Sequence, residues 1–440
     1  MVKIVFIGAG STVFVRNVIG DCMCTPVLQD AEIALYDISP ERLKDSEIIL
    51  SALNQNINEG RAHISCYLGE AQRKAALKDA TFVINAIQVG GYEPSTIIDF
   101  EIPKKYGLRQ TIADTLGIGG IMRALRTIPV MDSFAHEIEE VCPDAWLLNY
   151  TNPMAMLTGY MLRYTDVKTV GLCHSVQVCS RELFEQLDMQ DKLEGRKEVI
   201  AGINHMAWLL SIKDKNGVDL YPEIKKRAAA KNAAGKHENM VRFDYIKNFG
   251  YYCTESSEHN AEYNPFYIKS KYPELIEKFA IPLDEYPRRC IRQIKGWEED
   301  KKNILANGKI SHERSNEYAS YIMEAIITSK PYALGGNVLN NGLIFNLPDE
   351  ACVEVPCLVN GTGITPCRIG PLPPILAAMN MTNINTQLLT IEAARTKTRE
   401  AIYHAAMLDP HTAAELSIDD IRALCDELID AHGPYMAMYK

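Results

Sequence analysis

The first residues of the chain contain the feature that most restricts its fold. The apolar run Lys3–Ile7 has the character of a buried strand, and it leads directly into Gly8-Ala9-Gly10 and a segment with helical spacing from Ser11 onward. In a doubly wound sheet, the first glycine of such a turn permits the tight bend, and the second lets the backbone approach a pyrophosphate at the helix N-terminus. We therefore expect Gly8, Gly10 and Ser11 to bind the phosphates of a dinucleotide.

An acidic residue at the end of the next strand supports this prediction. The run Glu32–Tyr36 is followed by Asp37, where the fold places a carboxylate against the ribose hydroxyls of the cofactor. A carboxylate there favours NAD over NADP, because it repels a 2′-phosphate. Two details depart from the usual fingerprint: Val13 replaces its third glycine, and the interval from Gly10 to Asp37 is longer than usual. The alternative is a glycine turn that serves only an ordinary strand–helix unit.

Strands and helices alternate through the first half of the sequence. We expect strands at Lys3–Ile7, Glu32–Tyr36, Ala80–Ala86, Ala145–Asn149 and Thr169–Cys173, with helices such as Pro40–Asn56 and Met122–Val141 between them. Apolar strands that alternate with helices predict an α/β fold, here a Rossmann-type doubly wound parallel sheet covered on both faces.

The second half is less regular and predicts an interleaved α+β domain. Gly202–Asp214 is expected to form a strand pair that turns at Lys215-Asn216-Gly217, because Asn-Gly is a turn signal. Ile375–Leu408 has the character of a helical segment that closes on the core. We expect residues 1–195 to form the dinucleotide-binding domain and residues 196–440 to form the second domain.

Charge and composition limit the functions that remain. The net charge of −10 argues against general binding of nucleic acid or anionic membrane, both of which need a basic surface. No run reaches the roughly 18 apolar residues of a membrane span, and the start MVKIVFIGAG lacks the features of a secretory signal. The twelve cysteines are scattered, so we expect reduced thiols and a cytoplasmic protein.

Three short blocks rich in polar side chains lie at the ends of expected elements. Asn149 and Asn152 belong to the block NYTNP, and Cys173 and His174 belong to GLCHS. Residues just beyond parallel strands line the ligand crevice of a doubly wound sheet, so we expect Asn152, Cys173 and His174 near the nicotinamide end of the cofactor. Asn149 is also expected to bind the cofactor. The third block, GINHM, contains His205 and opens the second half.

Together with other segments, these blocks resemble the family 4 glycoside hydrolases. GAGS, GLRQTIADTLGIGGIMRALRTIPV, NYTNP, GLCHS, GINHM, TESSEHNAEY, LDEYPRRC and HAAMLDPHTAA occur in the order typical of that family, over nearly the whole chain. The Cys-His pair of GLCHS is most similar to the melibiase-type α-galactosidases, because phosphosugar hydrolases often have Cys-Asp there. Ile118 departs from the family, which commonly has proline at this place. The family resembles lactate and malate dehydrogenases in fold, which agrees with the expected parallel sheet.

The resemblance also implies a metal centre. Cys173 and His205 would bind a divalent ion, usually Mn²⁺, and a metal with two protein ligands keeps positions open for two sugar hydroxyls. A thiolate by itself would favour Zn²⁺ over Mn²⁺. The alternatives are a buried structural thiol at Cys173 and a hydrogen-bonded core histidine at His205.

The resemblance also implies hydrolysis through transient oxidation, an exception to the usual two-carboxylate scheme of glycoside cleavage. NAD⁺ would remove a hydride from sugar C3, a base would take the C2 proton, the C1 substituent would leave, and water addition with hydride return would give net retention. Tyr263 is expected as the base, assisted by Asp114, and Glu262 is the alternative base. His174 is expected as the acid, because a histidine pKa of about 6.5 suits proton donation at neutral pH.

The expected substrate is an α-galactoside that contacts Asn152 and Arg289. A same-family α-glucosidase or a hexuronide hydrolase remains open, because side chains that recognise C4 and C6 cannot be placed from the sequence. A different class, an NAD-dependent hydroxy-acid dehydrogenase, would need no metal. Residues 196–440 are expected to bind metal and substrate and to form the contacts of a homodimer or homotetramer.

Overall fold

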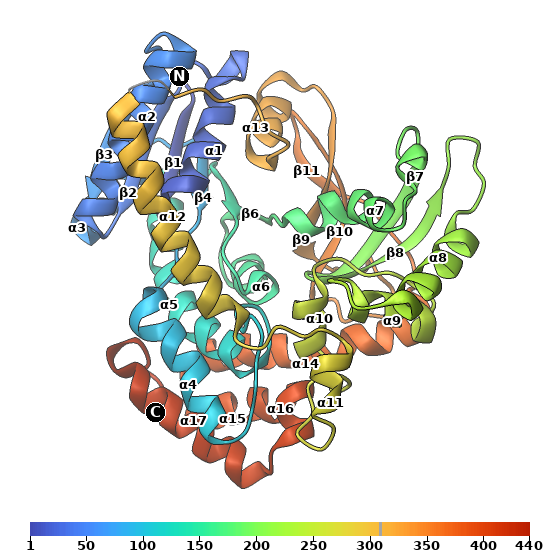
Figure 1. Ribbon diagram of the computed structural model, residues 1–440. Helices are drawn as coiled ribbons and strands as arrows, with labels where there is room; N and C mark the ends of the chain where they lie inside the picture. The colour runs from blue at the N-terminus through green and yellow to red at the C-terminus, as the bar shows by residue number, and fades with distance from the viewer. Residues whose placement is uncertain (308–309) are drawn as a thin grey trace.

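The computed structural model describes residues 1–307 and 310–440, and their strands form one mixed sheet (Figure 1). Its first half is parallel and follows the spatial order β3-β2-β1-β4-β5-β6. The strands are β1 Lys3–Ile7, β2 Glu32–Asp37, β3 His63–Leu68, β4 Phe82–Asn85, β5 Trp146–Asn149 and β6 Lys168–Gly171. This order is that of a Rossmann-type dinucleotide-binding sheet, which confirms the predicted fold class.

Alternate side chains of these short apolar strands pack on opposite faces of the sheet. Ile4 and Phe6 of β1 belong to one hydrophobic core, while Val5 and Ile7 belong to the other. Because successive strand side chains point to opposite faces, a strand that is apolar at every position must be covered on both sides. Helices α1 and α2 cover the first face, and α3, α5 and α6 cover the second.

Antiparallel strands continue the same sheet beyond β6. They follow the order β9-β10-β7-β8, with β11 paired to β10, and their bounds are β7 Lys197–Ile203, β8 Met206–Lys213, β9 Tyr332–Leu339, β10 Cys352–Asn360 and β11 Gly363–Pro366. The register pairs Gly171 with Asn337, Asn337 with Glu354, and Glu354 with Gly202. The strands that precede Cys173 and His205 are thus joined through β9 and β10.

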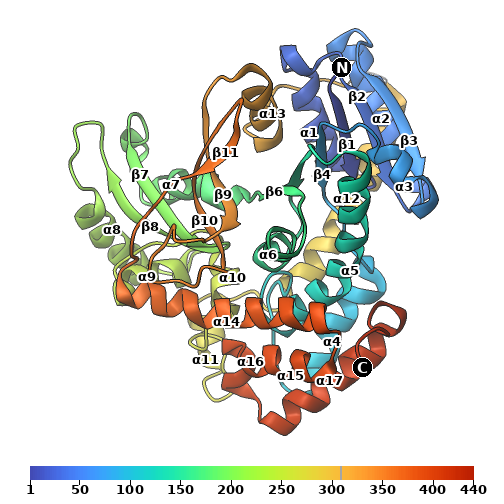
Figure 2. The ribbon, with the colours of Figure 1, turned by 180° about the vertical axis from the view of Figure 1, so that it is seen from behind.

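Helices surround both halves of the sheet, and α14 runs beneath both halves (Figure 2). The helices on the parallel half are α1 Thr12–Met23, α2 Pro40–Asn58, α3 Glu70–Leu77, α4 Ile97–Lys105, α5 Gly117–Val141, α6 Met154–Tyr164 and α7 His174–Gln186. The later helices are α8 Tyr221–Ala234, α9 Met240–Phe249, α10 Ser257–Glu262, α11 Glu274–Lys278, α12 Glu285–Asn307, α13 Tyr318–Thr328, α14 Pro374–Thr396, α15 Arg399–Met407, α16 Pro410–Glu415 and α17 Ile418–His432. Short helical turns lie at η1 Pro26–Leu28, η2 Gly91–Thr96, η3 Gln190–Lys192 and η4 Gly433–Tyr435.

The predicted hairpin in the second half was partly wrong. The range Gly202–Asp214 contains a tight turn at Asn204-His205 between β7 and β8, and the turn at Lys215-Asn216-Gly217 comes after β8. The sequence does not mark this turn because neither of its residues is a glycine, although His205 has a φ of 64°. The strand β3 was also missed. The division of the chain at residue 195 stays a prediction, because the sheet is continuous across it.

Two further observations bear on the predictions from composition. The twelve cysteines are all free thiols in the structure. No helix in the described ranges is both long enough and apolar enough to span a membrane.

Candidate active site

A cleft of about 420 Å³ lies where the parallel strands end and the second half of the molecule begins. Seven residues predicted from the sequence line it: Ser11, Asp114, Asn152, Cys173, His174, His205 and Arg289. They come from segments far apart in the chain, including the loops after β5 and β6, the β7–β8 turn and helix α12. The structure therefore brings together most of the side chains that the sequence singled out.

The glycine turn has the geometry expected of a phosphate-binding loop. Gly8 has a φ of 87°, and a Cβ there would lie 2.6 Å from the carbonyl oxygen of Ala86. A Cβ on Gly10 would lie 2.7 Å from Oδ2 of Asp37. Glycine is thus required at both positions for the backbone to follow this path. The hydroxyl of Ser11 is buried, has no partner among the described residues and lines the cleft.

Asp37 is held at the turn by two backbone amides. Its Oδ2 accepts a hydrogen bond from Gly10 N at 2.6 Å, and its Oδ1 accepts one from Ser39 N at 2.8 Å. The carboxylate therefore fixes the shape of the loop, a function that the sequence did not reveal. Val13, in place of the third fingerprint glycine, points its side chain toward solvent and leaves the turn undisturbed.

Asn149 lies behind the cleft wall. Its side chain is fully buried and bonds to Asn85, Thr151 and Thr158, and it does not line the cleft. This amide network ties the ends of β4 and β5 together. Asn152, three residues later, does line the cleft and donates to Oδ2 of Asp114 at 3.3 Å.

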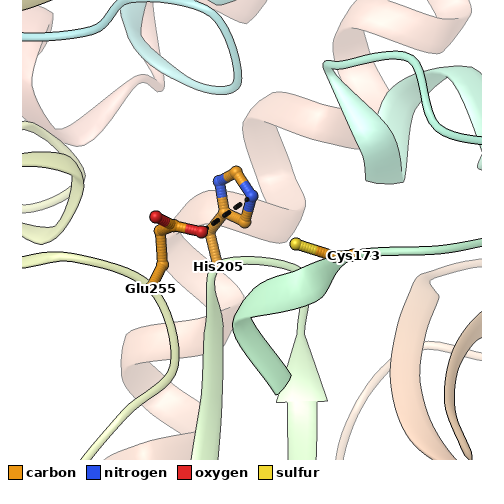
Figure 3. Close-up of side chains that lie close together, drawn as sticks. All are labelled: Cys173, His205 and Glu255. Atoms are coloured by element: carbon orange, nitrogen blue, oxygen red, sulfur yellow. Dashed lines mark ion pairs between the residues drawn. The ribbon is translucent and has the colours of Figure 1, made fainter. Parts of the chain in front are cut away.

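Cys173, His205 and Glu255 form a cluster in which one ligand atom of each lies within 4.8 Å of the others (Figure 3). Nε2 of His205 lies 3.3 Å from Oε2 of Glu255, while Nδ1 lies 2.9 Å from the hydroxyl of Tyr263. Burial raises the pKa of the Cys173 thiol, and the carboxylates of Glu354 and Glu255 raise it further. A divalent cation would reverse this effect, because its charge favours the thiolate. Thiol, imidazole and carboxylate are all metal-binding groups, so the cluster fits such an ion.

The two neighbouring histidines favour the ionised form of Glu255. Burial by itself would raise the pKa of Glu255, but the rings of His205 and His259 lower it to about 2. The sequence analysis did not single out Glu255, although it lies in the block TESSEHNAEY. No local pattern marks it, because Glu255 lies before α10 and reaches His259 from outside that helix.

His259 bridges two carboxylates on the wall of the cleft. Its Nδ1 lies 3.4 Å from Oε1 of Glu255, and its Nε2 lies 3.7 Å from Oδ1 of Asp114. Burial lowers the pKa of His259, but these two carboxylates outweigh it and raise the pKa above its usual range. Burial likewise opposes ionisation of Asp114, yet His259 and Arg123 hold the pKa of that carboxyl well below its usual range. The two shifts together favour a proton on the His259 ring and a charged carboxylate on Asp114.

His174 begins α7 and bonds through Nε2 to Glu317, which precedes α13. The hydrogen bond to Glu317 raises the pKa of His174, while burial partly opposes it. Because about half of the side chain is exposed at the cleft, the ring can meet a bound molecule.

The two candidate bases lie away from the cleft lining. Tyr263 follows α10, is buried, and bonds to His205. Burial raises the pKa of Tyr263 well above its usual value, and the carboxylates of Asp114, Glu262 and Glu255 raise it further. Glu262 accepts hydrogen bonds from the backbone N–H groups of residues 111–113 and so anchors the loop that carries Asp114.

Two arginines line the cleft, and both have polar partners. Arg289 bonds to Glu258, and Arg123, which the sequence analysis missed, donates to the carbonyl oxygen of Asn152 and to the hydroxyl of Tyr286. The lining carboxylates of Asp114 and Glu255 further offset their charge.

Comparison with known proteins places the chain in one family. Residues 3–189 match the model "Family 4 glycosyl hydrolase", and residues 200–412 match "Family 4 glycosyl hydrolase C-terminal domain". The chain is 61% identical to an α-galactosidase of Bacillus subtilis (strain 168) over all of both chains. It is 33% identical to an α-galactosidase of Rhizobium meliloti (strain 1021), over 99% of this chain and 89% of that one.

A solved structure with the same fold supports the architecture. A 6-phospho-α-glucosidase from gut microorganisms, in complex with NAD and Mn²⁺, superposes with a TM-score of 0.79 and 21% identity. The match covers 99% of this chain and 98% of that one. Both halves of the sheet thus belong to a single known fold.

Proposed function

Because the chain belongs to the family 4 glycosyl hydrolases, we propose that it hydrolyses α-galactosides with NAD and a divalent metal ion, Mn²⁺ by preference, as cofactors. The observation that carries the proposal is the 61% identity to an α-galactosidase over the whole of both chains, combined with a metal-binding cluster in the cleft. A similarity of this extent indicates a common fold.

NAD would be bound by the glycine turn and its neighbours. Gly8 and Gly10 allow the tight turn that leads to the N-terminus of α1, where free backbone N–H groups favour an anion. The unpartnered hydroxyl of Ser11 offers another donor. Asp37 still has free lone pairs for ribose hydroxyls, although it already accepts from two amides.

The divalent ion would be held by Cys173 and His205. When bound, the cofactors supply reversible hydride removal at C3 of the sugar and polarisation of the neighbouring oxygen atoms. The protein contributes a fixed geometry: Cys173 caps α7, and His205 occupies a two-residue turn between paired strands. Both side chains are therefore presented by rigid elements.

Proton transfer would use the groups on the cleft walls. His174 with Glu317 can donate a proton to the departing oxygen, because the hydrogen bond to Glu317 raises the pKa of the ring and so favours its protonated form. Asp114 with His259 lies on another wall and can pass a proton to or from a base. Tyr263 remains the proposed base at C2, and its bond to His205 gives it a second task, which is to orient that ring. Glu262 is a poorer candidate, since its oxygens are occupied by three backbone amides.

The charges of the cleft favour a neutral sugar. Recognition of a phosphate or a C6 carboxylate calls for an uncompensated cation, often a bidentate arginine. Arg289 is paired with Glu258, and Arg123 faces Asp114 across Asn152. Asn152 and Arg289 would instead bind sugar hydroxyls. We further propose a reducing, cytoplasmic location, consistent with the free cysteines, and a homodimer or homotetramer.

The test is an assay of nitrophenyl α-galactoside, α-glucoside and α-galacturonide with NAD⁺, Mn²⁺ and a reductant. We expect cleavage of the galactoside without accumulation of NADH. Activity only on the glucoside or the galacturonide would contradict the galactoside proposal while leaving the family intact. NADH formed in proportion to product would instead indicate a dehydrogenase.

A further inference from the structure

Glu255 faces the two proposed metal ligands across a short gap. Figure 3 shows His205 and Glu255 side by side, with the thiol of Cys173 directed toward them from the opposite loop. Because Nδ1 of His205 is bonded to Tyr263, Nε2 is the ring nitrogen left for a metal, and it is the atom that lies 3.3 Å from Glu255. The carboxylate is thus on the metal-binding side of the ring.

The backbone holds Glu255 at this place. The segment before it pairs with β8 through a bridge between Trp208 and Cys253 and a hydrogen bond from Thr254 N to the carbonyl oxygen of Ala207 at 2.8 Å. Ala207 follows the turn that carries His205 by two residues. The pairing of this segment with β8 therefore fixes the relative position of the imidazole and the carboxylate.

Both residues also adopt a backbone conformation that is unusual for their type. His205 has a φ of 64° and Glu255 has a φ of 65°, in the left-handed region that favours glycine. Residues held there cost free energy and concentrate at active sites and ligand-binding sites. The coincidence of two such residues in contact indicates that the position of both side chains matters.

The chemistry of the donor set points in the same direction. A thiolate and an imidazole suit Zn²⁺, whereas carboxylate oxygens suit Mn²⁺ and Mg²⁺. An oxygen ligand would make the centre more favourable for the harder ions. We infer that Glu255 is a third protein ligand of the divalent ion, alongside Cys173 and His205. This inference rests on the metal centre proposed above and adds a ligand to it.

The test measures metal binding directly in the full chain. Wild type, Cys173→Ala, His205→Ala and Glu255→Gln are stripped with a chelator, and Mn²⁺ affinity is measured by calorimetry or by the electron paramagnetic resonance of free Mn²⁺. Loss of groups that only support a metal ligand weakens binding about 10- to 100-fold, so loss of a ligand itself should cost at least about tenfold in Glu255→Gln. The preference for Mn²⁺ over Zn²⁺ should also fall in this variant.

Co²⁺ absorption separates ligation from a general charge effect. In Glu255→Gln we expect the thiolate-to-metal charge-transfer band of Cys173 to persist while the d–d bands change. The matched control is Glu182→Gln, which removes a carboxylate from the neighbouring helix α7, where it pairs with Arg242. It should leave both affinity and spectrum unchanged.

The outcomes distinguish the two proposals. If Cys173→Ala and His205→Ala abolish Mn²⁺ binding but Glu255→Gln retains wild-type affinity and d–d bands, Glu255 is not a ligand and the inference is overturned. If Cys173→Ala and His205→Ala bind Mn²⁺ as wild type does, the metal centre itself is wrong and the inference fails with it.

Discussion

Nδ1 of His205 lies 2.9 Å from the hydroxyl of Tyr263, a buried residue 58 positions later in the chain. A metal on Nε2 requires the proton of the neutral ring to be on Nδ1, which would then donate to the tyrosine oxygen. This one hydrogen bond selects the tautomer and orients the ring toward Cys173 and Glu255. It links the residue proposed as the base to the proposed metal centre.

Tyr263→Phe tests this link. We expect Mn²⁺ affinity to fall about tenfold or more, because outer partners of metal-bound histidines usually contribute that much. Activity should fall at the same time, even at saturating Mn²⁺ if Tyr263 is also the base. Wild-type Mn²⁺ affinity in this variant would contradict the orienting role. The control is Tyr267→Phe, since Tyr267 bonds to Asp244 rather than to any residue of the cluster.

Asp37→Asn should weaken NAD binding. The carboxylate accepts hydrogen bonds from Gly10 and Ser39, and bonds to a charged group contribute about 1.5–3 kcal/mol each. We expect the Kd for NAD to rise about tenfold or more, measured by calorimetry, and the discrimination against NADP to shrink. An unchanged ratio of the NAD and NADP constants would limit Asp37 to shaping the loop. Asp30→Asn, at an exposed site just before β2, is the control.

Asp99→Asn should destabilise the fold. Asp99 lies buried between Arg126 of α5 and His432 of α17. Its Oδ2 lies 2.6 Å from Nη2 of Arg126, and its Oδ1 lies 2.9 Å from Nε2 of His432. Asp99 therefore joins the parallel half to the C-terminal helices. Removal of one partner from a buried ion pair costs about 3–5 kcal/mol, because the other charge is left uncompensated. Urea unfolding should show a lower midpoint. Asp144→Asn removes an exposed partner of Lys168 and should change stability by less than about 1 kcal/mol.

Glu354 should make the metal-free protein less stable as the pH rises. Burial raises the pKa of Glu354 from its ordinary 4.5 to about 7, although His205 and Asn337 oppose the shift. Between these two values the folded state keeps a proton that the unfolded state has released, so the free energy of unfolding contributed by this group falls with increasing pH. Above the pKa of Glu354 in the folded state, the carboxyl is ionised in both states, and the folded state bears the full free-energy cost of the buried charge.

The variant Glu354→Gln removes this dependence. In the presence of a chelator, its urea midpoint relative to wild type should be higher at pH 8 than at pH 5. Titrating groups that do not interact with Glu354, such as Glu262, contribute equally to both proteins and cancel in the comparison. The control is Glu350→Gln, at an exposed position before β10. The difference between its urea midpoint and that of wild type should be the same at pH 5 and at pH 8. If the urea midpoint of Glu354→Gln relative to wild type is the same at pH 5 and pH 8, the prediction is wrong.

The sequence predicted the parallel half of the fold because that half is encoded locally. Ile4–Ile7 is apolar at every position, which is typical of a strand covered on both faces, and the glycines after it follow a backbone path that other residues cannot follow. The strand that ends at Asp37 was predicted for the same reason, because the run before Asp37 is apolar. The family resemblance, which the family models confirm, then led to Cys173 and His205 as the proposed metal ligands.

Only the tertiary structure decided which groups meet. Glu255 and His259 join Cys173, Asp114 and His205 through strand pairing between segments far apart in the chain, and no local pattern records that distance. The structure likewise placed Asn149 and Tyr263 behind the cleft wall, because burial and hydrogen bonds to neighbouring elements fix the direction of each side chain. The sequence alone determined that an NAD-type glycine turn would form, whereas the composition of the metal-binding cluster depends on long-range packing.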